Sequence, residues 1–174
     1  QYERDALDTH IGALAKATSK GLLMGARGNS GVILSQIFRG FATSVENKET
    51  LTARDLADAL MSGAQIAYKS VMKPTEGTIL TVIREAAAKA NQVANESDDI
   101  VVLMRAVDEA AQVALASTPD LLPVLKEVGV VDSGGQGLVF VLNAFYQVLS
   151  GEFNEDELKT PDNAELDQMV KELH

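Results

Sequence analysis

Apolar residues recur at helical spacing along most of this chain. In the segment 30–44 they form one stripe, because positions three and four apart share a face of an α-helix; the members are Ile33, Leu34, Ile37, Phe38 and Phe41. The same spacing predicts further helices, over 5–20, 52–71, 77–95, 98–116, 121–128 and 135–150. Beyond the short stretch 128–131, no segment shows the period of two that indicates a β-strand.

Residues that begin or end helices mark several of these segments. Thr52 is followed three residues later by Asp55, which is the pattern of a capping box. Gly151 lies where the last apolar helix should end. Pro119 lies where a helix would begin, so we expect the preceding helix to end before it and a short helix to follow over 121–128.

The pattern as a whole predicts an all-α fold. We expect about eight antiparallel helices with short connections, packed as a bundle or barrel. With 174 residues and 46% hydrophobic residues, the chain is long enough for one domain with a sizeable core. We place this domain at 1–151 and an acidic tail, or terminal helix, at 152–174. The apolar stripes are interpreted as core, with a lipid pocket lined by them as the less favoured alternative.

Composition excludes several classes of function. The net charge of −10 argues against a nucleic-acid surface, which needs clustered Lys and Arg. There is no cysteine, and the two histidines are His10, in the first predicted helix, and His174, the last residue. These counts argue against a thiolate nucleophile, a zinc cluster and a histidine-based triad. No stretch approaches the roughly 20 apolar residues of a membrane span, so we expect a cytoplasmic protein.

Glycine-rich segments precede three of the predicted helices. Segment 25–31 reads Gly-Ala-Arg-Gly-Asn-Ser-Gly, and segment 130–137 reads Val-Val-Asp-Ser-Gly-Gly-Gln-Gly. Segment 73–78, Lys-Pro-Thr-Glu-Gly-Thr, is a weaker example. Unpaired N–H groups and the helix dipole make a helix start attractive to anions, and glycine lets a phosphate approach the backbone. We therefore expect three helix N-termini to converge at one end as a phosphate site; the alternative is that they are caps only.

These segments also resemble a known family. Residues 21–36, 71–80 and 125–135 are similar to the DAK-type nucleotide-binding domain of bacterial fatty acid kinase, and more distantly to the ADP-binding subunit of dihydroxyacetone kinase. The resemblance covers about residues 10–150 with the three segments in the same order. It implies a helical barrel that binds Mg-ATP at one end, through the loops that open the helices.

The resemblance also implies which residues bind the nucleotide. Gly28, Asn29, Ser30 and Gly31 would hold the phosphates, and Thr78 with Ile79 would line the pocket. The last loop would close over the nucleotide with Asp132, Ser133 and Gly134. Arg27 either adds a phosphate contact or pairs with a surface acid.

The sequence departs from the family pattern in its metal loop. The family carries an upstream Asp-Gly-Asp-Thr-Gly-type loop that binds magnesium, and no such segment occurs here. We therefore assign no metal ligand and no catalytic residue, and we expect the Mg²⁺ ligands upstream of a chain that begins at Gln1 rather than Met. The triplet Thr118-Pro119-Asp120 replaces a Gly-Arg-Ala pattern of the dihydroxyacetone kinase subunit, which favours the fatty acid kinase branch.

The resemblance implies transfer of the ATP γ-phosphoryl group to a fatty acid carboxylate. A separate fatty-acid-binding partner protein would present that acid. Two alternatives stay open: a nucleotide subunit of a polyol kinase of the dihydroxyacetone type, and a non-catalytic helical scaffold. By itself, this chain is expected to be inactive.

Overall fold

The computed structural model of the chain describes residues 30–48 and 50–151. These residues form six α-helices and no strand, which confirms the all-α prediction for this part of the chain. The helix predicted over 5–20 and the tail 152–174 lie outside the described residues. The helices are α2 (Ser30–Val45), α3 (Ala53–Lys69), α4 (Ile79–Ala94), α5 (Ile100–Leu121), α6 (Pro123–Val128) and α7 (Ser133–Ser150).

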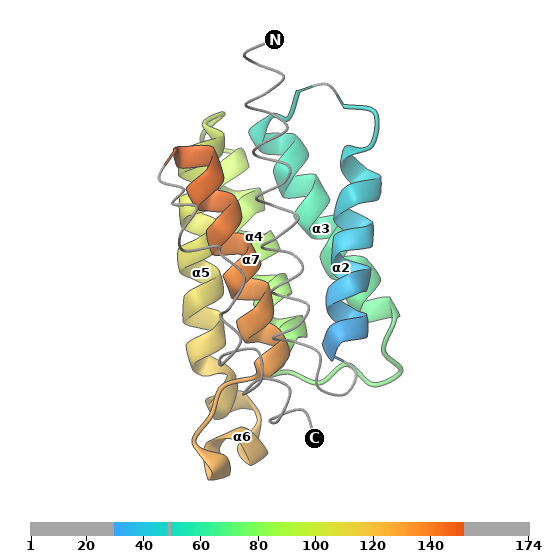
Figure 1. The fold of residues 1–174 in the computed structure, drawn as a ribbon, viewed down its shortest axis with the longest axis vertical. Helices are drawn as coiled ribbons and strands as arrows, with labels where there is room; N and C mark the ends of the chain where they lie inside the picture. Colours follow the sequence, from blue (N-terminus) through green and yellow to red (C-terminus); the bar gives the residue numbers. More distant parts are fainter. Residues whose placement is uncertain (1–29, 49, 152–174) are drawn as a thin grey trace, which may run out of the picture.

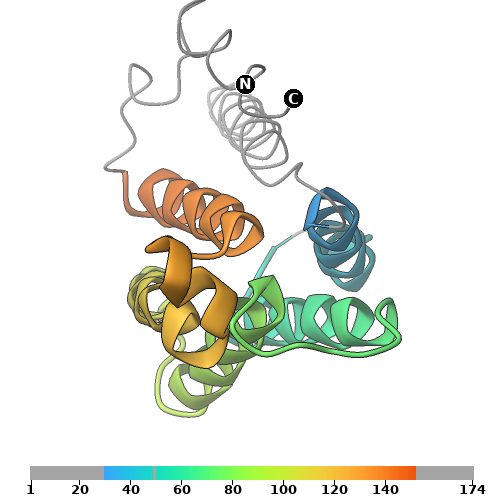
Figure 2. The same cartoon turned by 90° about the horizontal axis from the view of Figure 1, so that it is seen from below.

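The long helices pack side by side in a bundle. α2 packs on α3, α3 on α4, α4 on α5, and α5 on α7. α2, α4 and α7 begin at the lower end of the bundle in Figure 1, where the short α6 also lies. The view along the bundle shows the five long helices placed around a common interior (Figure 2). None of the described helices is both long and apolar enough to span a bilayer.

The core is built mainly from aliphatic side chains and alanine, as the apolar stripes predict. α2 and α3 cross at two glycines, which allow their backbones to approach closely. A Cβ atom on Gly40 would lie 3.1 Å from the Cα of Gly63, and a Cβ on Gly63 would lie 2.9 Å from the carbonyl oxygen of Ile37. The largest fully buried side chains are Leu34, Ile37, Leu56, Ile79, Leu80, Val82, Ile83, Leu103, Met104, Val107, Leu138 and Val141.

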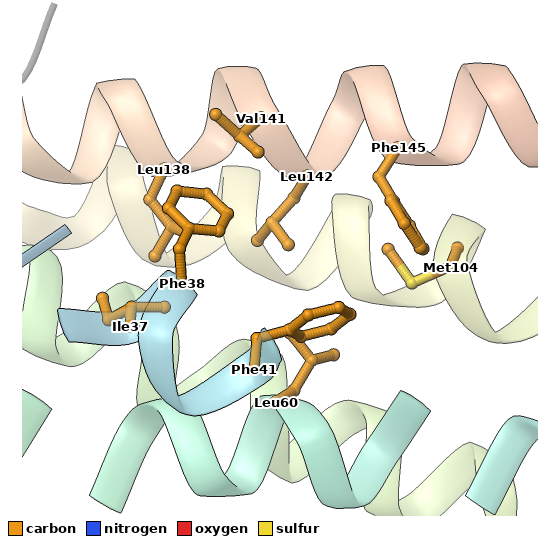
Figure 3. A pocket seen from close by; sticks show the side chains of 9 residues that line it. All are labelled: Ile37, Phe38, Phe41, Leu60, Met104, Leu138, Val141, Leu142 and Phe145. Carbon is orange, nitrogen blue, oxygen red and sulfur yellow. The ribbon is translucent and has the colours of Figure 1, made fainter. Parts of the chain in front are cut away.

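A small apolar cavity lies between α2, α3, α5 and α7 (Figure 3). Its volume is about 70 Å³, well below the roughly 300–1,000 Å³ of typical ligand pockets. The rings of Phe41 and Phe145 meet edge to face beside it, with centroids 6.0 Å apart. This size favours the interpretation of the stripes as core over the lipid pocket. The cavity is lined by Ile37, Phe38, Phe41, Leu60, Met104, Leu138, Val141, Leu142 and Phe145.

The predicted break at Pro119 is wrong. α5 continues through this proline to Leu121. A proline inside a helix lacks the N–H that would reach the carbonyl four residues earlier. Here the hydroxyl of Thr118 donates to that carbonyl, on Leu115, at 2.7 Å. The chain breaks instead at Leu122, which has extended backbone angles because Pro123 follows it and begins α6.

Other predicted helix ends are confirmed. The Thr52 hydroxyl accepts from the Asp55 N–H at 3.1 Å, and the Asp55 carboxylate accepts from the Thr52 N–H at 3.0 Å, which completes the capping box of α3. Gly151 follows α7 with φ of 76°, the left-handed conformation that favours glycine. Local sequence therefore determines these two helix boundaries.

Candidate functional site

The three helices that follow the glycine-rich segments begin at the same end of the bundle (Figures 1 and 2). Ser30, the first residue of α2, lies directly against Gly134 in the first turn of α7. A Cβ atom on Gly134 would lie 2.7 Å from the Cβ of Ser30 and 2.8 Å from its hydroxyl oxygen. Only a glycine lets these two helix starts approach so closely. The convergence predicted from the cap pattern is therefore present.

Asp132 lies between the starts of α7 and α4. It is the N-cap of α7, and its carboxylate accepts a 2.9 Å hydrogen bond from the N–H of Gly135. The backbone N–H of Ile79, the first residue of α4, lies close enough to the same carboxylate to lower its pKa. Its own N–H donates to the hydroxyl of Thr118 at 3.2 Å. Asp132 thus links the end of α5 to the start of α7, beside the start of α4.

The carboxyl group of Asp132 is poorly solvated. Burial raises its pKa above the ordinary value, and the N–H groups of Gly135 and Ile79 offset part of that rise. A second anion close to this carboxylate would meet repulsion. An anionic ligand at this end therefore needs a cation with it.

Thr78 and Ile79 are engaged within the protein. Thr78 is the N-cap of α4; its hydroxyl accepts from the N–H of Leu80 at 3.2 Å and donates to the carbonyl of Thr75 at 2.7 Å. The side chain of Ile79 is buried in the core. At the start of α4, the Thr78 hydroxyl and the Leu80 N–H thus both have partners within the protein.

The start of α7 retains donors for a ligand. The first intrahelical bond runs from the N–H of Gln136 to the carbonyl of Asp132, at 2.9 Å. The N–H groups of Ser133 and Gly134 precede this bond, so they have no intrahelical acceptor. They lie at the positive end of an 18-residue helix dipole, next to the hydroxyl of Ser30. This group of donors can hold a phosphate oxygen.

The structure does not describe every predicted site residue. Arg27, Gly28 and Asn29 lie outside the described residues, while Gly31 is in the first turn of α2. Within the part of the chain that is described, no group of three or more His, Asp or Glu side chains could hold a metal ion.

Sequence reasoning missed two residues at this end. Thr118 supports both Pro119 and Asp132, and the signal was its position directly before a proline. Glu76 accepts hydrogen bonds from side chains on both α3 and α4. The only sequence signal for it was an acid shortly before a helix start.

Comparisons with known proteins show the family to which this chain belongs. The profile of the DAK2 domain matches residues 1–147. An uncharacterized protein of Staphylococcus saprophyticus is 59% identical over 146 residues, which are 84% of this chain and 26% of that protein. Protein YloV of Bacillus subtilis is 54% identical over 173 residues, 99% of this chain and 31% of its own length. The chain thus spans less than a third of the length of these relatives. It belongs to the DAK2 domain family, whose domains in general bind ADP or ATP.

Proposed function

We propose that this chain is the ATP-binding domain of a kinase that transfers the γ-phosphoryl group of ATP to a fatty acid, which a separate fatty-acid-binding protein presents. Membership of the DAK2 family supports the nucleotide. The similarity of segments 21–36, 71–80 and 125–135 to fatty acid kinase supports the acceptor. The whole reaction belongs to the longer protein, of which the relatives show a counterpart more than three times the length of this chain.

The observation that carries the proposal is the contact between Ser30 and Gly134. It brings the start of α2 against the start of α7, so that a hydroxyl and two backbone N–H groups face one region. The positive ends of two helix dipoles add to these donors. In the proposal, Ser30, Gly31, Ser133 and Gly134 hold the phosphates, with Arg27, Gly28 and Asn29 completing the loop before α2.

In this proposal, the boundary of the pocket is formed by Thr78, Ile79 and Asp132. They bound the nucleotide pocket where the starts of α4 and α7 meet, and the Ile79 N–H lies close enough to the Asp132 carboxylate to lower its pKa. The polar groups of Thr78 and Asp132 bond mainly to other groups of the protein. The pocket is thereby built before the nucleotide arrives.

Phosphoryl transfer to a carboxylate needs little from side chains. A carboxylate oxygen attacks the γ-phosphorus, the bond to the bridging oxygen breaks, and ADP leaves with an acyl phosphate as the other product. The acceptor is already ionised and needs no general base. Positioning and neutralisation of charge supply most of the acceleration, and so we assign no catalytic residue.

Magnesium would supply part of that neutralisation when it is bound with ATP. The half-buried carboxylate of Asp132 makes such a cation more necessary. None of the described residues is assigned as its ligand, since these residues contain no suitable cluster.

The test is titration with Mg-ATP, followed by thermal shift and calorimetry, on this chain and on the longer protein. Binding to the native state raises the melting temperature with ligand concentration. Ser30→Ala should weaken binding, while Ser44→Ala, the same change at the other end of α2, should not. If neither protein is stabilised by Mg-ATP, the glycine-rich starts are caps only and the kinase proposal fails.

The acceptor needs a separate assay on the longer protein. Transfer of radiolabelled γ-phosphate to a protein-bound fatty acid would support the proposed substrate. Transfer to dihydroxyacetone with no transfer to fatty acid would refute it and leave the nucleotide site intact.

A further inference from the structure

The loop that leads into α4 is held by one carboxylate, that of Glu76. This loop, residues 70–78, crosses the lower end of the bundle from α3 to α4 (Figures 1 and 2). Most of its residues are exposed, but it ends at Gly77 and Thr78, which are packed into the site. Its exposed part therefore needs an anchor if those two residues are to stay in place.

Three side chains donate to Glu76. Tyr68, on α3, donates its hydroxyl to Oε2 at 3.0 Å. Thr81, on α4, donates its hydroxyl to the same oxygen at 3.2 Å. Arg84, also on α4, donates to Oε1 at 2.6 Å and donates its Nε–H to the hydroxyl of Tyr68 at 3.2 Å. The carboxylate thus joins two helices through the loop between them.

The chain of hydrogen bonds from Glu76 continues to the backbone of the loop. The hydroxyl of Thr81 is buried; because it donates to Glu76, its oxygen is left to accept, and it accepts the N–H of Gly77 at 2.8 Å. Gly77 has φ of 83°, and a Cβ on it would lie 2.7 Å from the Cβ of Leu122. The peptide before Thr78 is therefore fixed both by contact with the end of α5 and by a chain of hydrogen bonds that ends at Glu76.

We propose that Glu76 is a positioning residue of the nucleotide site: through Thr81 it holds Gly77 and Thr78 in the arrangement that lets the start of α4 meet Asp132. This inference rests on the proposed function. Glu76 itself does not contact the nucleotide. Tyr68 and Arg84 hold its carboxylate in place by hydrogen bonds, with Oε2 toward the hydroxyl of Thr81.

The chain offers a matched control for this proposal. Glu85 also pairs with Arg84, at 3.0 Å, and is about as exposed as Glu76, with side-chain exposures of 47% and 44%. The ion pair with Glu76 runs from α4 to the loop, whereas that with Glu85 stays within α4. Because exposed ion pairs contribute little to stability, Glu76→Gln and Glu85→Gln should both leave the melting temperature close to that of wild type.

The experiment measures the dissociation constant of Mg-ATP by calorimetry, first for the wild type and then for four variants. Glu76→Gln and Thr81→Val should each weaken binding by about tenfold, the scale of one hydrogen bond to a charged group. Glu85→Gln and Thr81→Ser, which retains the hydroxyl, should bind as the wild type does. Amide exchange at Gly77 should accelerate in the first pair alone, while exchange in α5 and α7 stays unchanged.

The outcomes separate this inference from the function on which it rests. If the wild-type chain and the longer protein both fail to bind Mg-ATP, the proposed function fails and the positioning role falls with it. A different result refutes the positioning role alone. In that case the wild type binds Mg-ATP, but Glu76→Gln either binds it equally well or exchanges its Gly77 amide no faster than the wild type. Equal weakening by Glu85→Gln would also refute it, because the effect would then come from lost negative charge.

Discussion

The hydroxyl of Thr118 accepts the backbone N–H of Asp132 at 3.2 Å while it donates to the carbonyl of Leu115 at 2.7 Å. Thr118 is fully buried. A single hydroxyl therefore completes the helix around Pro119 and holds the N-cap of α7 against the end of α5.

Replacing Thr118 by valine keeps the shape of the side chain and removes both hydrogen bonds. Two partly buried backbone groups then lose their partner, so we expect a loss of about 2–4 kcal/mol in the free energy of unfolding. Thr118→Ser should lose much less, since it keeps the hydroxyl. Urea denaturation measures both. Equal stability of Thr118→Val and wild type would show that water replaces the hydroxyl.

Replacing Gly134 by alanine should separate the starts of α2 and α7. The new Cβ would lie 2.7 Å from the Cβ of Ser30, so we expect a destabilisation of about 1–3 kcal/mol. Adding Ser30→Gly removes the obstructing side chain and should restore stability, because alanine is otherwise the better helix residue. A double-mutant cycle by denaturation measures this coupling. Additive effects would contradict the close contact.

Asp55 makes stability depend on pH in the acid range. Its hydrogen bonds with Lys48 and with the Thr52 backbone lower its pKa from the ordinary 3.8 to about 2. The unfolded chain therefore takes up this proton first as the pH falls, and the stability that Asp55 contributes is present above 3.8 and lost between 3.8 and about 2. Asp55→Asn should lack this loss. Asp58→Asn, on the same helix, should retain it in acid denaturation curves.

Asp132 should give the opposite pH dependence. Burial raises its pKa in the folded state, so the native protein binds this proton more readily than the unfolded chain does. Stability from this group falls as the pH rises through the range above 3.8, the ordinary value of the pKa. The stability of the wild type relative to Asp132→Asn should therefore increase as the pH is lowered toward that value. Asp120→Asn, on the exposed side of α5, serves as the control in the same denaturation series.

Local signals predicted the parts of the fold that local chemistry determines. The capping box of Thr52 and Asp55 and the end of α7 at Gly151 each depend on residues within one turn, and both were predicted. Pro119 was misread because its missing N–H is replaced by the hydroxyl of its neighbour, a choice of side-chain rotamer that a helix pattern does not contain.

The sequence predicted where the candidate site lies, but it did not predict most of the contacts within it. Glycine-rich helix starts indicated that α2, α4 and α7 begin together. The pattern could not show that the Asp132 carboxylate lies close to the N–H of Ile79, because these two residues are far apart in sequence. Glu76 was missed for the same reason: its partners come from two helices that only the tertiary fold brings together.

The crossing of α2 and α3 at Gly40 and Gly63 acts on the site from a distance. Gly40 lies ten residues after Ser30, roughly 15 Å along a helix. Because the two backbones touch there, α2 can rotate about this contact, and even a small rotation displaces its first turn. A side chain forced into the crossing would tilt α2 and swing Ser30 away from Gly134 without touching either residue. Loss of nucleotide binding could thus arise from a substitution in the middle of the bundle.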